Sequence, residues 1–213
     1  MIHLHTWLTP NGHKVSIMLE ELGVPYTVHP VDLSAKEQLR PEFLALSPNN
    51  KVPAIVDDEA GNLSIFESGA ILTYLAEKHG RLLPADGPTR YKALEWLHWH
   101  NGGLGPMSQH LVYFLWKWKN QLPAGTQRVI DELNRLLNVI DTRLADATYL
   151  AGDTYTIADI INYPWIAAGT KSFAHVLGDL LQARPHLARW LALVGQRSAV
   201  QRGMQVPTIH LAH

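Results

Sequence analysis

The chain has 213 residues, 46% of them hydrophobic, and a formal net charge of -1, which is the composition of an ordinary globular protein. It offers no basic field for nucleic acid, and no apolar run approaches the roughly 20 residues of a membrane-spanning helix. Cysteine is absent, which excludes disulfides, a cysteine nucleophile and a zinc–thiolate site. The 12 histidines lack the spacing of a helical zinc site, so no metal is expected. The opening residues lack the charged and apolar regions of a secretory signal, so a cytoplasmic location is expected.

The first third of the chain mixes short strands with helices. The predicted elements are, in chain order, a strand at 2–7, a helix at 13–22, a strand at 26–32, a short helix at 41–46, strands at 54–57 and 63–66, and a helix that ends near Gly80. The first two strands are joined through a helix, so they should be parallel with a right-handed crossover. The last two are joined by a turn-like segment and should form a hairpin. Residues 1–82 are therefore predicted to be a small mixed α/β domain.

Strand signals vanish beyond 83–88, which its prolines and glycine mark as a linker. The predicted elements there are a long helix at 89–118 that breaks at the glycine-rich 102–106, a helix capped by Thr126 with an apolar face over 129–144, a helix that follows a capping box at 156–159 and bends at Pro164, and short helices at 176–182 and 185–196. Residues 89–213 are therefore predicted to be an all-helical domain. Four of its aromatic side chains belong either to its core or to a cleft facing the first domain: Trp96, Trp99, Tyr113 and Trp116.

Two short stretches outline a candidate binding site beside the hairpin. A cis Val52–Pro53 bond would turn the N–H and C=O of Val52 outward, where they could pair with an extended peptide. Ser68 is placed as the N-cap of the following helix, whose N–H groups and partial positive charge suit a carboxylate. The adjacent Glu67 would hold an ammonium, so the site suits a short peptide with an amino-acid head. The alternative is a trans proline that opens a strand, with Glu67 and Ser68 only capping a helix.

These stretches resemble a known family. Residues 47–55 (SPNNKVPAI) and 66–71 (FESGAI) resemble the glutathione-binding core of the glutathione S-transferases, and the resemblance extends over the whole chain. Within that family, residues 9–14 (TPNGHK), 49–51 (NNK) and 102–107 (GGLGPM) are similar to the bacterial nu class, a disulfide-bond oxidoreductase type related to yeast nitrogen-regulator-like proteins. The resemblance implies a thioredoxin-like N-terminal domain, a helical C-terminal domain, a homodimer and glutathione as cosubstrate.

The resemblance also implies roles for individual residues. The γ-glutamyl head of glutathione would lie on Glu67 and Ser68, and its cysteinyl backbone would pair with Val52, next to a cis Pro53. Its glycyl carboxylate would meet Lys51, helped by Gln38. Arg128 is the best match to an arginine that reaches a second glutathione in the nu class, although an exposed helix arginine is an equal alternative.

The thiol of glutathione must be activated by the protein, because a free thiol with a pKa of about 8.5 is mostly protonated at neutral pH. The chain has no Tyr, Ser or Cys just after the first strand. Thr9 and Asn11 are the candidate catalytic residues, since both can donate a hydrogen bond to sulfur at a helix start. The alternative is that the two residues only cap that helix.

The nu-class resemblance implies an enzyme that binds two glutathiones or glutathione disulfide, reduces disulfides and conjugates weakly. One bound thiolate would attack a disulfide substrate, and a second glutathione would resolve the mixed disulfide. Two alternatives stand beside this function. The aromatic-rich helical domain suits a transferase that conjugates hydrophobic electrophiles, and the same fold can also serve as a non-catalytic binding or regulatory protein.

Overall fold

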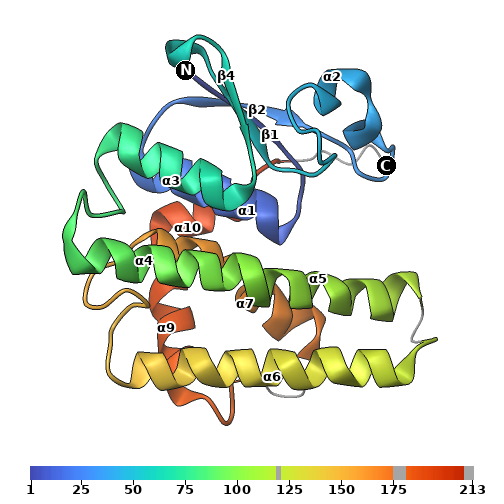
Figure 1. Ribbon diagram of the computed structural model, residues 1–213, viewed down its shortest axis with the longest axis vertical. Coiled ribbons are helices and arrows are strands. Elements are labelled where there is room, and N and C mark those ends of the chain that lie inside the picture. The colour runs from blue at the N-terminus through green and yellow to red at the C-terminus, as the bar shows by residue number, and fades with distance from the viewer. Residues whose placement is uncertain (119–120, 175–180, 209–213) are drawn as a thin grey trace. The chain divides into compact units, whose positions relative to one another are not determined.

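The computed structural model describes residues 1–118, 121–174 and 181–208 (Figure 1). Its contacts divide the chain into two compact units. The first unit is Met1–Leu83 together with the chain from Gln196 onward, and the second is Pro84–Gly195. This division differs at the C-terminal end from the one predicted, which placed all of 89–213 in the helical domain.

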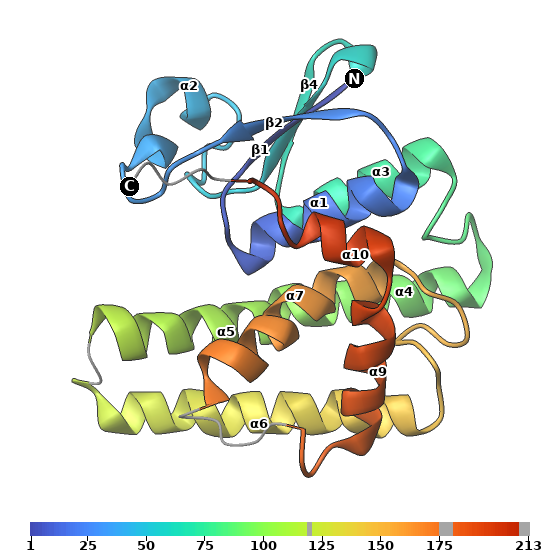
Figure 2. The ribbon, with the colours of Figure 1, turned by 180° about the vertical axis from the view of Figure 1, so that it is seen from behind.

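The first unit is built on a four-stranded sheet with the order β2-β1-β3-β4 (Figures 1 and 2). Its strands are β1 (Ile2–Thr6), β2 (Tyr26–Pro30), β3 (Ala54–Asp57) and β4 (Leu63–Phe66). The pair β1–β2 is parallel, as predicted for strands joined through a helix, and β3 pairs antiparallel with both β1 and β4. The predicted hairpin is therefore confirmed, with both of its strands at the expected residues.

Helices α1 (Pro10–Leu22) and α3 (Ser68–His79) contact each other and the sheet. Helix α1 begins earlier than predicted, because Pro10 can occupy a first helical position and Thr9 caps it. The Thr9 hydroxyl oxygen accepts from the N–H of Gly12 at 3.1 Å. Helix α3 ends at Gly80 in a left-handed conformation, as its sequence indicates.

The short helix α2 (Pro41–Leu44) follows a 3₁₀ turn at Glu37–Leu39. Its buried Phe43 belongs to an apolar cluster with Val31, Val52 and Ala54. This cluster anchors the chain that enters β3 and so fixes the position of Val52 beside the candidate site.

Helix α10 (Ser198–Gly203), which the sequence pattern did not indicate, packs on α1. The Ser16 hydroxyl donates to the carbonyl oxygen of Gly203 at 2.6 Å. A Cβ at Gly203 would lie 2.6 Å from the backbone of Ile17, so this contact requires glycine. The Arg197 guanidinium also pairs with the Glu21 carboxylate through contacts of 2.6 and 2.8 Å.

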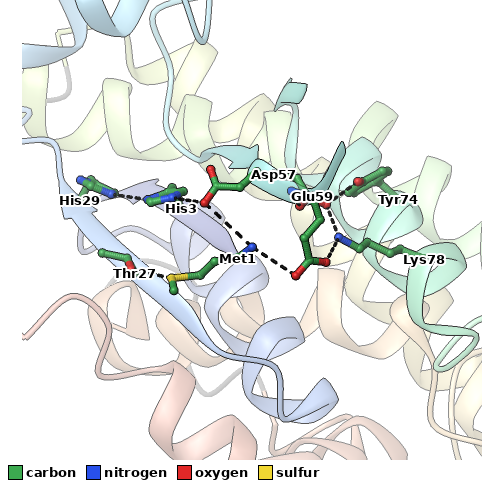
Figure 3. A network of polar contacts seen from close by, with 9 residues as sticks. Met1, His3, Thr27, His29, Asp57, Glu59, Tyr74 and Lys78 are labelled. Carbon is green, nitrogen blue, oxygen red and sulfur yellow. Dashed lines mark hydrogen bonds and ion pairs between the residues drawn. The ribbon is translucent and has the colours of Figure 1, made fainter. Parts of the chain in front are cut away.

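A polar network ties the hairpin to α3 and to β1 (Figure 3). The buried carboxylate of Asp57 accepts hydrogen bonds from the Tyr74 hydroxyl at 2.6 Å and from the Lys78 ammonium at 2.5 Å. Burial alone would raise the pKa of Asp57, but these bonds and one from the N–H of Glu59 outweigh it and lower the pKa. On the β1 side, His3 lies 2.9 Å from the carboxylate of Asp58.

Replacing Lys78 by methionine should lower the free energy of unfolding at pH 7 by about 1–3 kcal/mol, because it removes a donor from a buried carboxylate. The pKa of Asp57 is lowered from 3.8 in the folded protein, so this stability is present above that pH and is lost as the pH falls below it. Denaturant titrations at pH 7 and at pH 3 measure both effects. Lys92→Met, which removes an exposed pair with Glu95, serves as the control and should cost little. A loss of unfolding free energy in Lys78→Met that is the same at both pH values would show that Lys78 does not stabilise the ionised form of Asp57.

The second unit is helical in its described part. Its helices are α4 (Gly87–Trp99), α5 (Gly105–Val112), α6 (Pro123–Ala145), α7 (Ile157–Ser172) and α9 (Pro185–Gly195), with π-helical segments at His100–Leu104 and Tyr113–Lys117. The predicted helix at 185–196 is thus confirmed as α9, whereas the one predicted at 176–182 lies mostly outside the described residues. None of the described helices is long and apolar enough to cross a membrane.

The predicted break at 102–106 is wrong, because the backbone continues there as a π-helical turn. The buried His100 ring lies 3.0 Å from the side-chain oxygen of Asn162. A Cβ at Gly105 would come within 2.9 Å of that ring, so the glycine makes room for a packed histidine rather than for a loop.

Helix α6 begins at Pro123, so Thr126 lies inside the helix and is not its cap. Its hydroxyl donates to the carbonyl oxygen of Leu122 at 3.1 Å, a bond that a threonine inside a helix can make to the preceding turn. The predicted apolar face is confirmed by its buried members: Val129, Leu133, Leu136, Leu137, Ile140 and Leu144.

The predicted capping box at the start of α7 is confirmed. Thr156 accepts from the N–H of Ala158, and the buried carboxylate of Asp159 accepts from the N–H of Thr156 at 3.0 Å. The same carboxylate also accepts from the N–H of Leu150 at 3.0 Å and from the indole of Trp190 at 2.8 Å. Asp159 therefore joins three segments of the second unit at one point.

Candidate functional site

A pocket in the first unit brings together six of the residues that the sequence singled out. Its walls come from the start of α1, the loop before β3, the end of β4 and the start of α3. The lining residues are Asn11, Ser47, Lys51, Val52, Pro53, Phe66, Glu67 and Ser68. Ser47 and Phe66 were not assigned a role in the site from the sequence.

The loop before β3 holds the Val52–Pro53 bond in the cis form, as predicted. Buried Ser47 shapes this loop, since its hydroxyl donates to the carbonyl oxygen of Lys51 at 2.9 Å. Its own carbonyl oxygen accepts from the N–H of Asn50 at 2.9 Å. The loop is thus closed on itself and carries Val52 to the pocket wall.

Glu67 has a backbone φ of 70°, a sparsely populated region for a residue with a side chain. It is the N-cap of α3, so the prediction that Ser68 caps this helix is wrong, and Ser68 is instead its first residue. The Glu67 side chain makes no capping bond. Plain helix capping therefore does not explain this residue, and a strained backbone that aims a carboxylate at a pocket is typical of a functional position.

The carboxylate of Glu67 is solvent-exposed and lies 3.4 Å from the side-chain nitrogen of Asn49. A ligand ammonium would therefore meet it at the rim of the pocket rather than in a buried recess. The neighbouring Ser68 is buried at 8% exposure, and it begins a helix of 12 residues whose first N–H groups suit an anion. An exposed carboxylate and the start of a helix thus lie side by side.

Lys14 is the unexpected member of this region. It lies on α1, is only 2% exposed, and its Nζ is 2.8 Å from Oδ1 of Asn11 and 3.5 Å from Oγ of Ser68. Burial lowers the pKa of Lys14 to about 7, against the opposing effect of the Glu67 carboxylate. Its spacing of three residues from Asn11 places the two side chains on one helix face, which is a signal for their contact though not for the burial of Lys14.

Three predicted site residues do not line this pocket. Thr9 caps α1, which is the alternative that the sequence left open, although its hydroxyl hydrogen can still donate to a ligand. Gln38 lies in the 3₁₀ turn before α2, and its side-chain oxygen is buried without a hydrogen-bond partner among the described residues. Arg128 is exposed on α6 of the second unit.

The pocket offers groups of complementary charge for a zwitterionic peptide. Glu67 supplies a carboxylate, Lys51 and Lys14 supply positive charge, and Asn11 supplies an amide. Among the described residues, no cluster of three or more His, Asp or Glu side chains could hold a metal ion. The groups present can bind and orient a peptide and can favour an anion on it.

A four-stranded mixed sheet with a cis-proline before β3, followed by an all-helical unit, is the architecture of a thioredoxin-like domain joined to a transferase-type helical domain. The chain belongs to the glutathione S-transferase family. The family model for the N-terminal domain matches residues 1–77, and the model for the C-terminal domain matches residues 107–197.

Several known proteins are similar to this chain over most of their length. The disulfide-bond oxidoreductase YfcG of Escherichia coli is 46% identical over 175 residues, which are 80% of this chain and 81% of that protein. A glutathione transferase family member from Pseudomonas fluorescens, solved with two glutathiones bound, superposes with a TM-score of 0.92 and 41% identity over 97% of this chain and 93% of its own. A glutathione transferase from Pseudomonas putida, solved with one glutathione disulfide bound per subunit, superposes with a TM-score of 0.91. It is 40% identical, and the match covers 97% of this chain and 91% of that one.

Proposed function

We propose that this protein is a glutathione-dependent disulfide-bond oxidoreductase of the nu-class type, with weak conjugating activity. The observation that carries the proposal is a pocket that Glu67, Ser68 and Val52 line together, in a chain without cysteine. The similarity to the disulfide-bond oxidoreductase YfcG and to the two Pseudomonas glutathione transferases, which bind glutathione or its disulfide, supports it.

Glutathione would bind as an extended peptide along the pocket. Its γ-glutamyl ammonium would meet the Glu67 carboxylate, and its γ-glutamyl α-carboxylate would meet the N–H and hydroxyl of Ser68 at the start of α3. The cysteinyl backbone would pair with Val52, which would direct the sulfur toward Asn11. The glycyl carboxylate would meet the exposed Lys51.

The chemistry is thiol–disulfide exchange, with all sulfur supplied by the ligands. A bound glutathione thiolate attacks one sulfur of the substrate disulfide, which forms a mixed disulfide and releases the other half as a thiolate. A second glutathione thiolate attacks the glutathione sulfur of that mixed disulfide, which forms glutathione disulfide and releases the second half. The two protons lost by the glutathione thiols are taken up by the two released thiolates.

Turnover of hydroxyethyl disulfide in the presence of glutathione tests this function directly. We expect catalysed formation of glutathione disulfide well above the uncatalysed exchange. Normal glutathione binding without turnover would exclude the reductase. Activity confined to a chloronitrobenzene substrate would favour a conjugating transferase instead.

The Asn11→Ala variant should chiefly raise the pKa of the bound glutathione thiol, because it removes an amide donor to the sulfur. We expect a rise of about one unit, which reduces the thiolate fraction near neutral pH by about tenfold. An ultraviolet absorbance titration of the thiolate in the complex measures this pKa. A bound thiol that titrates as in the unmodified protein would show that Asn11 does not contact the sulfur.

One observation favours the transferase as a second function. The helical unit exposes large aromatic side chains, with Tyr113 at 41% and Trp116 at 59% exposure, whereas Trp96 belongs to the core. Such surfaces suit hydrophobic electrophiles. A non-catalytic binding role is less well supported, because Glu67, Ser68 and the cis Val52–Pro53 bond are all present in the pocket.

Three further assignments belong to this proposal. Arg128 would reach a second glutathione, which the exchange requires, and replacing it should impair resolution of the mixed disulfide more than its formation. The protein would act as a homodimer. It would work in the cytoplasm, where the glutathione pool is reducing.

A further inference from the structure

Lys14 places a titratable amine beside the pocket in a position that packing alone does not favour. The residue is 2% exposed, and an ammonium taken out of water is costly unless it is paired. A methionine of similar length would fill the same space without that cost. The presence of lysine therefore indicates a role that its charge and its donors can fill.

The contact with Asn11 determines how that side chain faces a ligand. An ammonium has three donors and no acceptor, so the atom 2.8 Å from Nζ must be the amide oxygen. A flipped amide would place its NH2 group against the ammonium. Asn11 lines the pocket, and its NH2 end is thereby the end that can donate to sulfur.

The contact with Ser68 acts at the other end of the ligand. Nζ of Lys14 lies 3.5 Å from Oγ of Ser68, so the ammonium donates and the hydroxyl oxygen accepts. A hydroxyl that accepts from an ammonium keeps its hydrogen for another partner. That hydrogen can donate to a carboxylate at the start of α3.

We propose that Lys14 is a positioning residue for bound glutathione: it orients the Asn11 amide as a donor to the cysteinyl sulfur and the Ser68 hydroxyl as a donor to the γ-glutamyl carboxylate. This inference rests on the proposed function and goes beyond it, because it links the two ends of the ligand through one buried side chain.

The charge state of Lys14 then depends on the ligand. Burial lowers the pKa of Lys14 to about 7, and Glu67 is the charged group that opposes this shift. A bound anion adds to the effect of Glu67 and raises the pKa. Lys14 therefore takes up a proton when a ligand without a thiol binds near pH 7 to 8, and it offsets the proton that glutathione's own thiol releases.

Two measurements on Lys14→Met and Lys14→Arg test the proposal. The first is the pKa of the bound glutathione thiol, from the ultraviolet absorbance of its thiolate. We expect Lys14→Met to raise it by about one unit, a tenfold loss of thiolate near neutral pH, and Lys14→Arg to restore part of the loss. The second is the proton uptake on binding S-methylglutathione, from calorimetry in buffers of different ionisation enthalpy. The unmodified protein should take up a proton and Lys14→Met should not.

The controls separate positioning from folding. Lys14→Met should fold and melt no lower than the unmodified protein at pH 7, because it removes a buried charge. Lys92→Met, at an exposed pair with Glu95, should change neither measurement. Should Lys14→Met fail to fold, Lys14→Arg decides: arginine is already protonated, so this variant should bind S-methylglutathione without taking up a proton, and an uptake equal to that of the unmodified protein overturns the proposal.

The possible failures can be told apart. A bound thiol pKa and a proton uptake in Lys14→Met equal to those of the unmodified protein overturn the role of Lys14 and leave the proposed function intact. An unmodified protein that does not bind glutathione overturns both.

Discussion

Replacing Asp159 by alanine is expected to lower the free energy of unfolding by about 4 kcal/mol, the largest loss of stability expected of any single substitution considered for this chain. The carboxylate is fully buried and accepts from the N–H groups of Leu150 and Thr156 and from the indole of Trp190. Alanine leaves these three donors without their acceptor, and each buried donor left unsatisfied costs about 1–3 kcal/mol. Denaturant unfolding followed by tryptophan fluorescence measures the loss, and the signal is direct because Trp190 is one of the partners.

Asp159→Asn divides this effect into parts. One oxygen of Asp159 accepts from both Leu150 and Trp190, and the other accepts from Thr156. Asparagine keeps one oxygen and places an NH2 group against the remaining N–H, so we expect a loss of roughly half the alanine value. Asp153→Ala, at an exposed position, is the matched control and should be nearly neutral. A small loss of unfolding free energy in both Asp159 variants would show that the second unit tolerates the loss of the hydrogen bonds that Asp159 accepts.

The pH dependence has the opposite sign at the two buried aspartates. Burial raises the pKa of Asp159 to about 6, above its ordinary value of 3.8. A raised pKa means that the folded protein binds a proton where the unfolded chain does not, so this contribution is present at low pH and is lost as the pH rises through about 6. The lowered pKa of Asp57 instead gives stability that is lost as the pH falls. The stability gap between the unmodified protein and Asp159→Asn should therefore widen between pH 7 and pH 4.

The strands of the first unit could be predicted because their boundaries depend on local pattern. The runs at 54–57 and 63–66 are short, apolar and bounded by polar turn residues, and the structure places β3 and β4 at the same residues. The apolar face of α6 was equally readable, since its period follows directly from helix geometry.

The helix starts and the short C-terminal helix depend on tertiary structure and were not readable in this way. Threonine is a residue type that often caps a helix, but α6 starts before Thr126, at Pro123. The glycines at 102–106 suggest a break, whereas packing around His100 uses them in a π-helical turn. Helix α10 has only six residues, and its contacts with α1 hold it in place.

The candidate site likewise contains residues that local motifs predict and residues that only the packing reveals. Val52, Pro53, Glu67 and Ser68 stand in motifs whose chemistry can be argued from residue type, and the structure brings them into one pocket. Lys14 was missed because lysine is expected at the surface, and only the packing of the first unit shows that it is buried. The strained backbone of Glu67 was missed for a similar reason, since its φ follows from how β4 is joined to α3.

Glu67→Ala is expected to weaken glutathione binding by about 30–100-fold, because it removes the carboxylate that holds the γ-glutamyl ammonium in a charge-assisted hydrogen bond of about 2–3 kcal/mol. This variant should lose more affinity than Asn11→Ala. The Glu67 carboxylate is exposed at the pocket rim, so the loss does not come from a buried ammonium left without a partner. It comes from the ion pair itself and from the loss of the negative charge that favours the protonated form of Lys14. For Asn11→Ala we expect a smaller loss of affinity, since it acts chiefly on the thiol pKa.

Isothermal titration with glutathione measures both affinities, and three comparisons make the result specific. Glu67→Gln keeps the length of the side chain and an acceptor oxygen, so it should fall between the unmodified protein and Glu67→Ala. Glu42→Ala, at an exposed position on α2 of the same unit, should bind normally. Alanine keeps the Cβ that makes a φ of 70° costly, so Glu67→Ala should have the same melting temperature as the unmodified protein. A change in affinity cannot then be attributed to backbone relaxation. Equal affinities for Glu67→Ala and Asn11→Ala would show that the ammonium of glutathione is held elsewhere, and the orientation of the peptide in the pocket would have to be reversed.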